Sequence, residues 1–129
     1  MKKTLMTLFA VLLAMAAHSE PSDKLIDSMV KVESKGISTA IGDKGRAVGI
    51  LQIHKGVIDD VNRKYKTKYT LADRWNEAKS REICRKYLLI YGGKNATDEK
   101  YARIWNGGPK GHLKKATEGY WSKVKRHLK

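Results

Sequence analysis

The order of apolar and polar residues divides this chain of 129 residues into two unequal parts. Thr4 to Ala17 is an apolar run without a charged residue, and Lys2 and Lys3 precede it. From about Ser22 onward, apolar residues recur every three or four positions, which is the spacing of one buried face of an α-helix. The pattern predicts a short N-terminal segment of a separate kind, followed by one domain that is mostly α.

A series of helices is predicted, because a residue that can cap or end a helix stands beside most of the periodic stretches. The expected helices are Asp23 to about Ser34, with Ser22 as its cap and Gly36 after its end; about Lys55 to Tyr65; a longer helix capped by Asn76 that reaches Tyr91 before Gly92-Gly93; a helix capped by Thr97 that runs through Trp105; and a last helix capped by Thr117, with Tyr120, Trp121, Val124 and Leu128 along one face. Gly42 to Gly49 is too rich in glycine for a helix and predicts a loop or a short β-hairpin.

Residues 1–19 have the features of a secretory signal peptide. The positive start and the apolar run are followed by Ala17-His18-Ser19, which supplies small residues for cleavage after Ser19. A membrane anchor is the alternative, but the run is short for crossing a bilayer and no stop-transfer pattern follows it. We therefore expect a secreted or periplasmic protein whose mature domain, residues 20–129, has no stable membrane insertion.

The charge of the chain is strongly positive, with 27 Lys and Arg against 13 Asp and Glu, a net +14. Loss of Lys2 and Lys3 with the signal peptide leaves 25 basic residues against the same 13 acidic ones, a net +12. Such a charge favours an anionic partner, which could be nucleic acid, an acidic membrane surface or a bacterial wall polymer. Export makes nucleic acid the weakest of the three. A basic surface that only aids solubility is the simpler alternative.

Cys84 is the only cysteine, so no disulfide can form within the chain. It lies among apolar residues of the predicted helix that ends at Tyr91, which favours a core position over the alternative of a reactive thiol. His54, His112 and His127 are scattered and lack the spacing of metal ligands. We expect a monomer that is stabilised by helix packing and has neither metal nor cofactor.

Glu33 is the candidate for an acid catalyst. It follows Met29 by four residues and Ile26 by seven, which places its carboxyl on the buried face at the C-terminal end of the first helix. Burial and the negative end of the helix dipole both disfavour a carboxylate and raise its pKa. The group can then stay protonated and donate a proton near neutral pH. The alternative is a surface glutamate in a frayed last turn.

Asp43 and Gln52 are candidates for the same site. Asp43 lies in Gly42-Asp43-Lys44-Gly45 and is expected to be solvated and ionised, and a protonated Glu beside an ionised Asp is the pair that glycoside hydrolysis uses. Taken alone, Asp43 fits an ordinary turn residue better. The Gln52 amide can bind sugar hydroxyl or N-acetyl groups, or it can be a partly buried amide satisfied by the backbone.

The run from Tyr101 to Gly111 leads from apolar and aromatic residues straight into Asn106-Gly107-Gly108-Pro109. A helix that ends this abruptly exposes backbone amides and carbonyls, and its glycines allow a ligand to approach the backbone closely. Polar polymers such as sugars bind bare backbone groups, an amide side chain and a flat ring. Trp105, Asn106 and Gly107 are therefore candidates for one wall of a cleft. The competing interpretation is that the glycines only end a helix.

Five runs together resemble the invertebrate-type (destabilase-like) lysozymes, a family of the lysozyme-like superfamily that also holds goose-type lysozymes and lytic transglycosylases. Val32-Glu33-Ser34 resembles the family's acid motif, and Gly49 to Ile53 resembles its Gly-Tyr-Phe-Gln-Ile. Cys84 to Gly92 falls where the family has a helix that ends in Arg-Tyr-Gly. Tyr101 to Gly111 resembles Tyr-Ala-Arg-Ile-His-Asn-Gly-Gly-Pro-Asn-Gly, and Ala116 to Val124 resembles Ser-Thr-Leu-Gly-Tyr-Trp-Asn-Lys-Val.

The resemblance implies a single lysozyme-like domain that cleaves the β-1,4 bond between N-acetylmuramic acid and N-acetylglucosamine in peptidoglycan. By resemblance Glu33 is the general acid and Asp43 the second carboxylate. The cleft would be lined by Ser34, Gln52, Trp105, Asn106, Gly107 and Tyr120. The chain departs from the family in two ways: it lacks the family's disulfides, and Trp105 stands where the family has His.

Two alternatives to a lysozyme remain. A lytic transglycosylase needs only one carboxylate and yields an anhydromuramyl product, so the presence of Asp43 favours hydrolysis. A basic wall-binding protein without catalytic activity would fit the charge, but the presence of both Glu33 and Asp43 argues against it.

Overall fold

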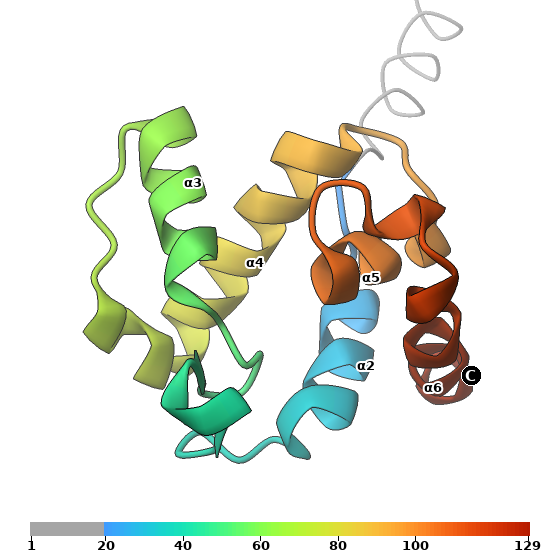
Figure 1. Ribbon diagram of the computed structural model, residues 1–129, viewed down its shortest axis with the longest axis horizontal. Coiled ribbons are helices and arrows are strands. Elements are labelled where there is room, and N and C mark those ends of the chain that lie inside the picture. The colour runs from blue at the N-terminus through green and yellow to red at the C-terminus, as the bar shows by residue number, and fades with distance from the viewer. Residues whose placement is uncertain (1–19) are drawn as a thin grey trace, which may run out of the picture.

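The computed structural model describes residues 20–129, and the expected signal peptide, residues 1–19, lies outside them. In chain order the elements are α2 (Asp23–Ser34), β1 (Ile41–Gly42), the 3₁₀ turn η1 (Asp43–Gly45), β2 (Ala47–Val48), α3 (Lys55–Tyr65), η2 (Leu71–Trp75), α4 (Glu77–Gly92), α5 (Asp98–Gly107), η3 (Gly111–Leu113), η4 (Lys115–Thr117) and α6 (Glu118–His127). The fold class is mostly α with one short hairpin in the described part, as the sequence predicts (Figure 1).

Three of the expected helix caps are confirmed by hydrogen bonds at the helix starts. The Ser22 hydroxyl accepts from the Leu25 amide at 3.1 Å. The Asn76 side chain accepts from the Lys79 amide at 2.8 Å, and Thr97 accepts from the Lys100 amide at 3.1 Å. Each bond satisfies one of the amides that the first turn of a helix leaves without a partner. The starts of α2, α4 and α5 are therefore set locally by the sequence.

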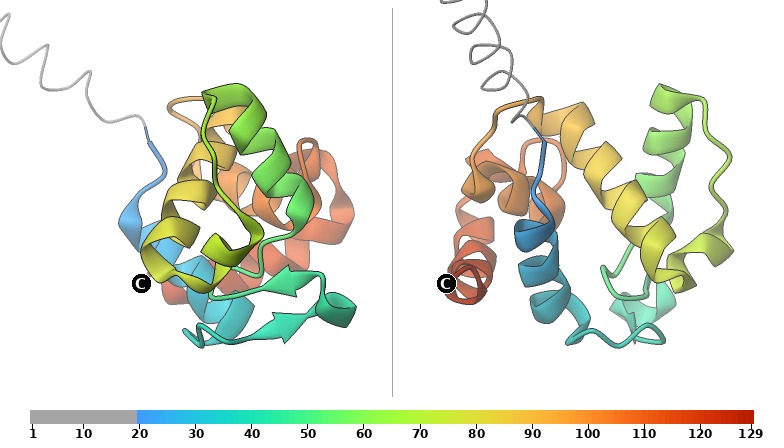
Figure 2. Two further views of the ribbon diagram at one scale, coloured as in Figure 1. Left: turned by 90° about the vertical axis from the view of Figure 1, so that its left-hand side faces the viewer. Right: turned by 180° about the vertical axis from the view of Figure 1, so that it is seen from behind.

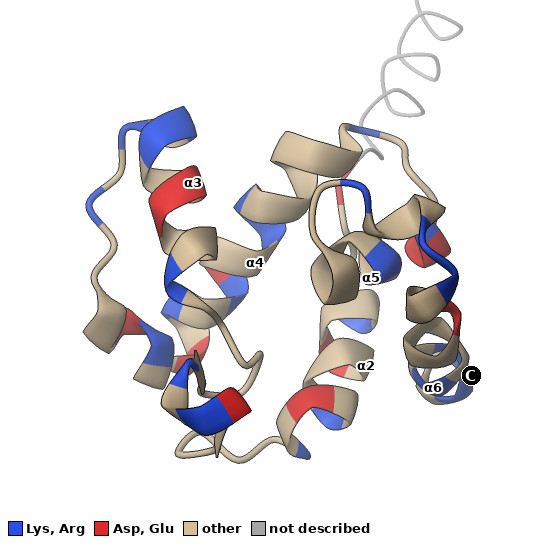
Figure 3. Ribbon diagram, viewed as in Figure 1, with Lys and Arg blue, Asp and Glu red and all other residues tan. Residues whose placement is uncertain are grey.

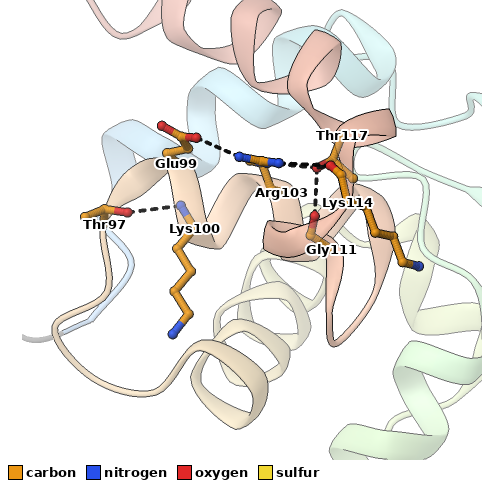
Figure 4. A network of polar contacts seen from close by, with 7 residues as sticks. All are labelled: Thr97, Glu99, Lys100, Arg103, Gly111, Lys114 and Thr117. Atoms are coloured by element: carbon orange, nitrogen blue, oxygen red, sulfur yellow. Dashed lines mark hydrogen bonds and ion pairs between the residues drawn. The ribbon is translucent and has the colours of Figure 1, made fainter.

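The expected cap at Thr117 is wrong. Its backbone is helical, with φ −91° and ψ −5°, and its side chain accepts no bond from the first turn of α6. Instead the Thr117 hydroxyl lies 2.7 Å from the Gly111 carbonyl oxygen and accepts a bond from Arg103 Nε at 2.9 Å (Figure 4). Thr117 is only 2 % exposed, so its hydroxyl forms hydrogen bonds in the interior of the fold and does not cap its own helix.

The glycine-rich segment forms a two-stranded antiparallel hairpin in which Ile41 pairs with Val48 and Gly42 with Ala47. Its turn contains three residues in succession with positive φ: Asp43 at 47°, Lys44 at 56° and Gly45 at 89°. Glycine adopts this conformation freely, whereas Asp and Lys adopt it at some cost. The hairpin therefore presents Asp43 at its tip in a constrained backbone conformation.

Helix α4 lies in the middle of the domain and separates two groups of elements. Figures 1 and 2 show α3 and η2 on one side of it and α2, α5 and α6 on the other. α4 contacts α3, η2, α5 and α2, and α6 packs against α2 and α5. The hairpin follows the C-terminal end of α2 and joins the two groups. The chain thus places the end of α2, the hairpin and the end of α5 around one space.

The core is formed by apolar side chains from these helices and from the segment after the hairpin. Cys84 in α4 is fully buried, and burial raises the pKa of its thiol, so the expected core position is confirmed. Complete burial of a Leu or Ile side chain contributes about 1.5–3 kcal/mol, and no disulfide is present to add to this. The largest fully buried side chains are Tyr101, Leu25, Ile26, Met29, Ile50, Leu51, Ile53, Ile83, Leu88, Ile104, Val61 and Val124.

Candidate active site

A cavity of about 300 Å³ opens between the end of α2, the hairpin, the start of α3 and the end of α5. It brings together Glu33, Asp43, Gln52, Trp105 and Asn106, all of which the sequence singles out. Three further residues line it: Ala47, His54 and Val57. Ser34, Gly107 and Tyr120 lie beside the cavity without lining it. The arrangement places the two candidate carboxyls in one cavity, although ten positions separate them in the chain.

Glu33 projects into the cavity from the last turn of α2. Burial raises the pKa of its carboxyl from 4.5 to about 7, and the hydrogen bond from Tyr120 opposes this rise. The Tyr120 hydroxyl donates to Glu33 Oε2 at 3.0 Å. A carboxyl with a pKa of about 7 is half protonated at neutral pH and can donate its proton to a bound oxygen.

Ser34 is buried in this fold and its hydroxyl is bound within the protein, and its role in sugar binding stays a prediction. Its side chain is 8 % exposed. The hydroxyl lies 2.8 Å from the Ile50 carbonyl oxygen and 3.3 Å from that of Val30, and it accepts a bond from the Gly36 amide at 3.1 Å. Because its capacity for hydrogen bonds is used within the protein, Ser34 ties the end of α2, next to Glu33, to the segment after the hairpin.

Asp43 faces the cavity from the tip of the hairpin, and its side chain is about half exposed. Arg46 Nη2 lies 3.3 Å from its Oδ1, and His54 Nε2 lies 3.5 Å from its Oδ2. The two neighbours approach different oxygens and so restrict the rotation of the carboxylate. Asp43 is therefore an oriented, water-accessible carboxylate in the same cavity as the largely desolvated carboxyl of Glu33.

Gln52 is held by the backbone and also lines the cavity. Its amide nitrogen donates to the carbonyl oxygens of Ala40 at 3.1 Å and Gly49 at 3.0 Å, so the backbone satisfies this end of the amide. Its Oε1 lies against Gly42, where a Cβ would come within 2.4 Å of it. The side chain thus braces the hairpin and also lines the cavity.

Trp105 and Asn106 form the opposite wall at the end of α5. The Trp105 indole donates to the Leu51 carbonyl oxygen at 3.2 Å, and its ring meets Tyr87 edge-on at 5.6 Å. These contacts fix the plane of the ring against the core. Asn106 is exposed and lines the cavity, and its side chain makes no hydrogen bond to any of residues 20–129.

Gly107 lies closely against the Thr117 side chain in η4. A Cβ at this position would lie 2.5 Å from Thr117 Cγ2, and the positive φ of the turn, 88°, falls on Gly108 instead. Lys114 Nζ donates to the Gly107 carbonyl oxygen at 2.8 Å. Gly107 thus packs the turn against η4, and its role as a cleft residue stays a prediction.

The sequence is similar to that of a known lysozyme. The chain is 36 % identical over 128 residues to a lysozyme of Ostrea edulis, and the match covers 93 % of this chain and 91 % of the oyster protein. The chain belongs to the invertebrate-type lysozymes. It is therefore a glycoside hydrolase, a muramidase whose substrate is peptidoglycan.

The fold agrees with this assignment. Two crystal structures of Meretrix lusoria lysozyme match it, one in complex with Aeromonas hydrophila PliI at a TM-score of 0.70 and one bound to an inhibitor at 0.71. Each is 24 % identical to the chain, and each match covers 81 % of this chain and 88 % of the other. At this identity the likeness is one of fold. No protein-family model matches the sequence.

Sequence reasoning missed His54, Ala47 and Val57 as cavity residues of this lysozyme. The sequence signal that could have placed His54 in the cavity is its position, two residues after Gln52 and directly before α3. Ala47 and Val57 are small or apolar and carry no chemical signal.

Within residues 20–129, no group of three or more His, Cys, Asp or Glu side chains lies close enough together to hold a metal ion. None of the helices described is both long enough and apolar enough to cross a membrane.

Proposed function

We propose that this lysozyme is exported and hydrolyses the β-1,4 bond between N-acetylmuramic acid and N-acetylglucosamine with Glu33 as general acid and Asp43 as the second carboxylate. One observation carries the proposal: a buried carboxyl with a pKa of about 7 and an oriented, half-exposed carboxylate line the same cavity. Environments that separate two carboxyls in this way are what acid-assisted glycoside cleavage requires.

In the first step, protonated Glu33 gives its proton to the glycosidic oxygen while the bond from that oxygen to the anomeric carbon breaks. The electron pair of the bond leaves with the oxygen, which becomes the hydroxyl of the departing sugar. Positive charge then develops on the ring oxygen and anomeric carbon of the remaining sugar. Tyr120 holds the Glu33 carboxyl through Oε2, which leaves Oε1 to face the substrate.

In this proposal, Asp43 is the group that faces the developing positive charge. Its carboxylate stabilises the oxocarbenium-like state electrostatically or positions the incoming water. Arg46 and His54 keep it oriented, and its half-exposed position gives water a path to the reacting carbon. Water then supplies a hydroxyl to the anomeric carbon, and its remaining proton is taken up by a carboxylate.

Trp105, Asn106 and Gln52 complete the proposed cleft. The face of an indole ring suits the apolar face of a pyranose, and the two amides can bind hydroxyl and N-acetyl groups. Gln52 offers its oxygen, because its nitrogen is bound to the backbone. In this proposal, Tyr120 acts on the site by its hydrogen bond to Glu33 and not by contact with the sugar.

A lytic transglycosylase is the alternative within the superfamily. It would use Glu33 alone and let the muramyl 6-hydroxyl attack, which yields an anhydro product. The presence of Asp43 in the cavity favours hydrolysis. Loss of turbidity of a bacterial wall suspension separates an enzyme from an inactive wall-binding protein, and mass spectrometry of the released fragments decides between the reducing and the anhydro product.

We also propose that the mature domain acts as a secreted or periplasmic monomer on anionic wall material. Both carboxyls and all the cleft residues come from one chain, so no second copy is needed to complete the site. Lys and Arg are distributed over the helices and turns on both sides of α4 (Figure 3). Their excess charge should hold the enzyme near an anionic wall and make its activity sensitive to salt.

A further inference from the structure

A second cavity, of about 320 Å³, adjoins the active site on the side of the hairpin. The two cavities share His54, and Arg46, which contacts Asp43, also lines the second one. No Asp or Glu lines it. Its lining residues are Gly45, Arg46, His54, Lys55, Gly56, Leu71 and Arg74.

The charge of this second cavity is positive and fixed in position. Arg74 Nε donates to the Leu71 carbonyl oxygen at 2.9 Å, and its Nη1 lies 3.1 Å from the Ile53 carbonyl oxygen and 3.3 Å from that of Arg46. Within residues 20–129, no carboxylate forms an ion pair with Arg74, and its Nη2 makes no hydrogen bond. A guanidinium that is anchored on backbone carbonyls and keeps the N–H groups of Nη2 free is preorganised to bind an anion.

Two further cationic residues, Arg46 and Lys55, line the same cavity as Arg74. Arg46 is paired with Asp43, and Lys55 with Asp59 at 2.8 Å, but both side chains are largely exposed and can extend over the cavity. Gly56 in the first turn of α3 adds the positive end of a helix dipole. The combination fits a carboxylate better than a neutral sugar, because a sugar would leave the guanidinium without a counter-charge.

We propose that this cavity, which we call the cationic subsite, binds a carboxylate carried by the 3-O side arm of the muramic acid residue in the cleft. The inference rests on the proposed function and extends it, because it makes the enzyme select muramic acid rather than N-acetylglucosamine at this position. Continuity with the active site favours a group attached to the bound sugar over a free wall polymer. The carboxylate can come from the lactyl group itself or from the peptide attached to it.

Lys55 is the residue that tests the cationic subsite. Arg74 bonds three backbone carbonyls, so its replacement would disturb the fold, and Arg46 contacts Asp43. Lys55 is exposed and pairs only with Asp59 in its own helix. The matched control is Lys64→Gln, which removes the same charge from an exposed position at the other end of α3.

Binding is measured by titration calorimetry in a Glu33→Gln background, so that the ligands are not cleaved. Three ligands of equal length are used: an N-acetylglucosamine–N-acetylmuramic acid oligomer that carries peptides, the same oligomer after an amidase has removed them and left lactyl carboxylates, and a chitooligosaccharide without carboxylates. We expect Lys55→Gln to weaken binding of at least one of the two carboxylate-bearing oligomers by about threefold to fivefold and to leave binding of the chitooligosaccharide unchanged. Thermal unfolding of each variant confirms that it is folded.

The three ligands also identify the source of the carboxylate. A loss on the amidase-treated oligomer alone assigns the lactyl carboxylate, because the peptide-bearing oligomer carries that group as an amide. A loss on the peptide-bearing oligomer alone assigns the peptide, and a loss on both shows that the cationic subsite accepts either carboxylate. Equal losses on all three ligands, or no larger effect from Lys55→Gln than from Lys64→Gln, would overturn the proposal. The proposed function is tested separately by cleavage of the same oligomers with unmodified Glu33, so its failure would not be confused with failure of the cationic subsite.

Discussion

The Tyr120 hydroxyl and the Glu33 carboxyl meet at 3.0 Å across 87 positions of the sequence. The contact opposes the effect of burial on Glu33, because a donated hydrogen bond stabilises the carboxylate. Tyr120 is partly buried, and burial of its hydroxyl beside Glu33 raises the pKa of that group well above the usual value, so it remains a donor. The pair therefore holds the acid at a pKa of about 7 and in one orientation.

Glu33→Gln should abolish wall lysis while the fold and sugar binding stay nearly intact. The amide has the size of the carboxyl but has no proton to give, and general acid catalysis typically contributes roughly 10²–10⁴-fold to the rate. Initial rates on purified peptidoglycan test this, with circular dichroism as the control for folding. Lysis at a rate near that of the unmodified enzyme would end the proposal for Glu33.

Tyr120→Phe should shift the alkaline limb of the pH–activity profile upward. Activity falls as pH rises through about 7, because Glu33 then loses the proton it must donate. Without the phenol, the carboxylate loses a donor, the pKa of Glu33 rises further and the limb moves up by about 1 pH unit. The matched control is Tyr91→Phe, which breaks a phenol–carboxylate bond to Asp60 on another part of the surface. Identical limbs in Tyr120→Phe and the unmodified enzyme would contradict the role of Tyr120.

The stability of the fold should also depend on the ionisation of Glu33. In the unfolded chain this carboxyl ionises near pH 4.5, whereas in the fold it keeps its proton up to about pH 7. The folded state therefore binds more protons in this window, and stability falls as pH rises from about 4.5 to 7. Glu33→Gln escapes this loss, so relative to the unmodified enzyme it should gain on the order of 3 kcal/mol between pH 4 and 8.

Urea unfolding at the two pH values measures this gain. The exposed Glu118→Gln variant serves as the comparison and should show a much smaller change. A constant stability difference between Glu33→Gln and the unmodified enzyme across this range would mean that Glu33 is not buried as the fold indicates.

Asp43→Asn should lower the rate strongly and leave the released fragments as reducing sugars. The substitution keeps the shape of the side chain and removes the charge that faces the transition state. His54→Gln provides a milder comparison, because it releases Asp43 Oδ2 without changing the carboxylate. An unchanged rate in Asp43→Asn together with anhydro fragments would show that the enzyme is a lytic transglycosylase.

Gly107→Ala should reduce stability by about 1–3 kcal/mol, because its Cβ would lie 2.5 Å from Thr117 Cγ2. Thr117→Ser removes that methyl group and keeps the hydroxyl that bonds to Gly111 and Arg103. The double variant should recover most of the loss, and thermal unfolding of the four proteins measures the coupling. Chitooligosaccharide affinity should stay unchanged in Gly107→Ala. Normal stability with weaker sugar binding would restore Gly107 as a cleft residue.

The helices and their starts could be predicted from the sequence, since both depend on neighbours within a few positions. Ser22, Asn76 and Thr97 each accept a bond from an amide three residues ahead. Thr117 has the same chemistry, but contacts with η3 and with Arg103 take its side chain. A capping signal is thus reliable only where no tertiary partner competes for the same hydroxyl.

The sequence by itself determined the fold class, the position of Glu33 on a buried helix face and the hairpin that carries Asp43, because periodicity and glycine spacing are local properties of the chain. Only the tertiary structure decided which distant groups meet. It joined Glu33 to Tyr120, set His54 against Asp43, used Ser34 and Gly107 for packing, and formed a cationic subsite from three separate segments. These contacts arise from the way helices pack on one another, and no pattern within a single segment encodes them.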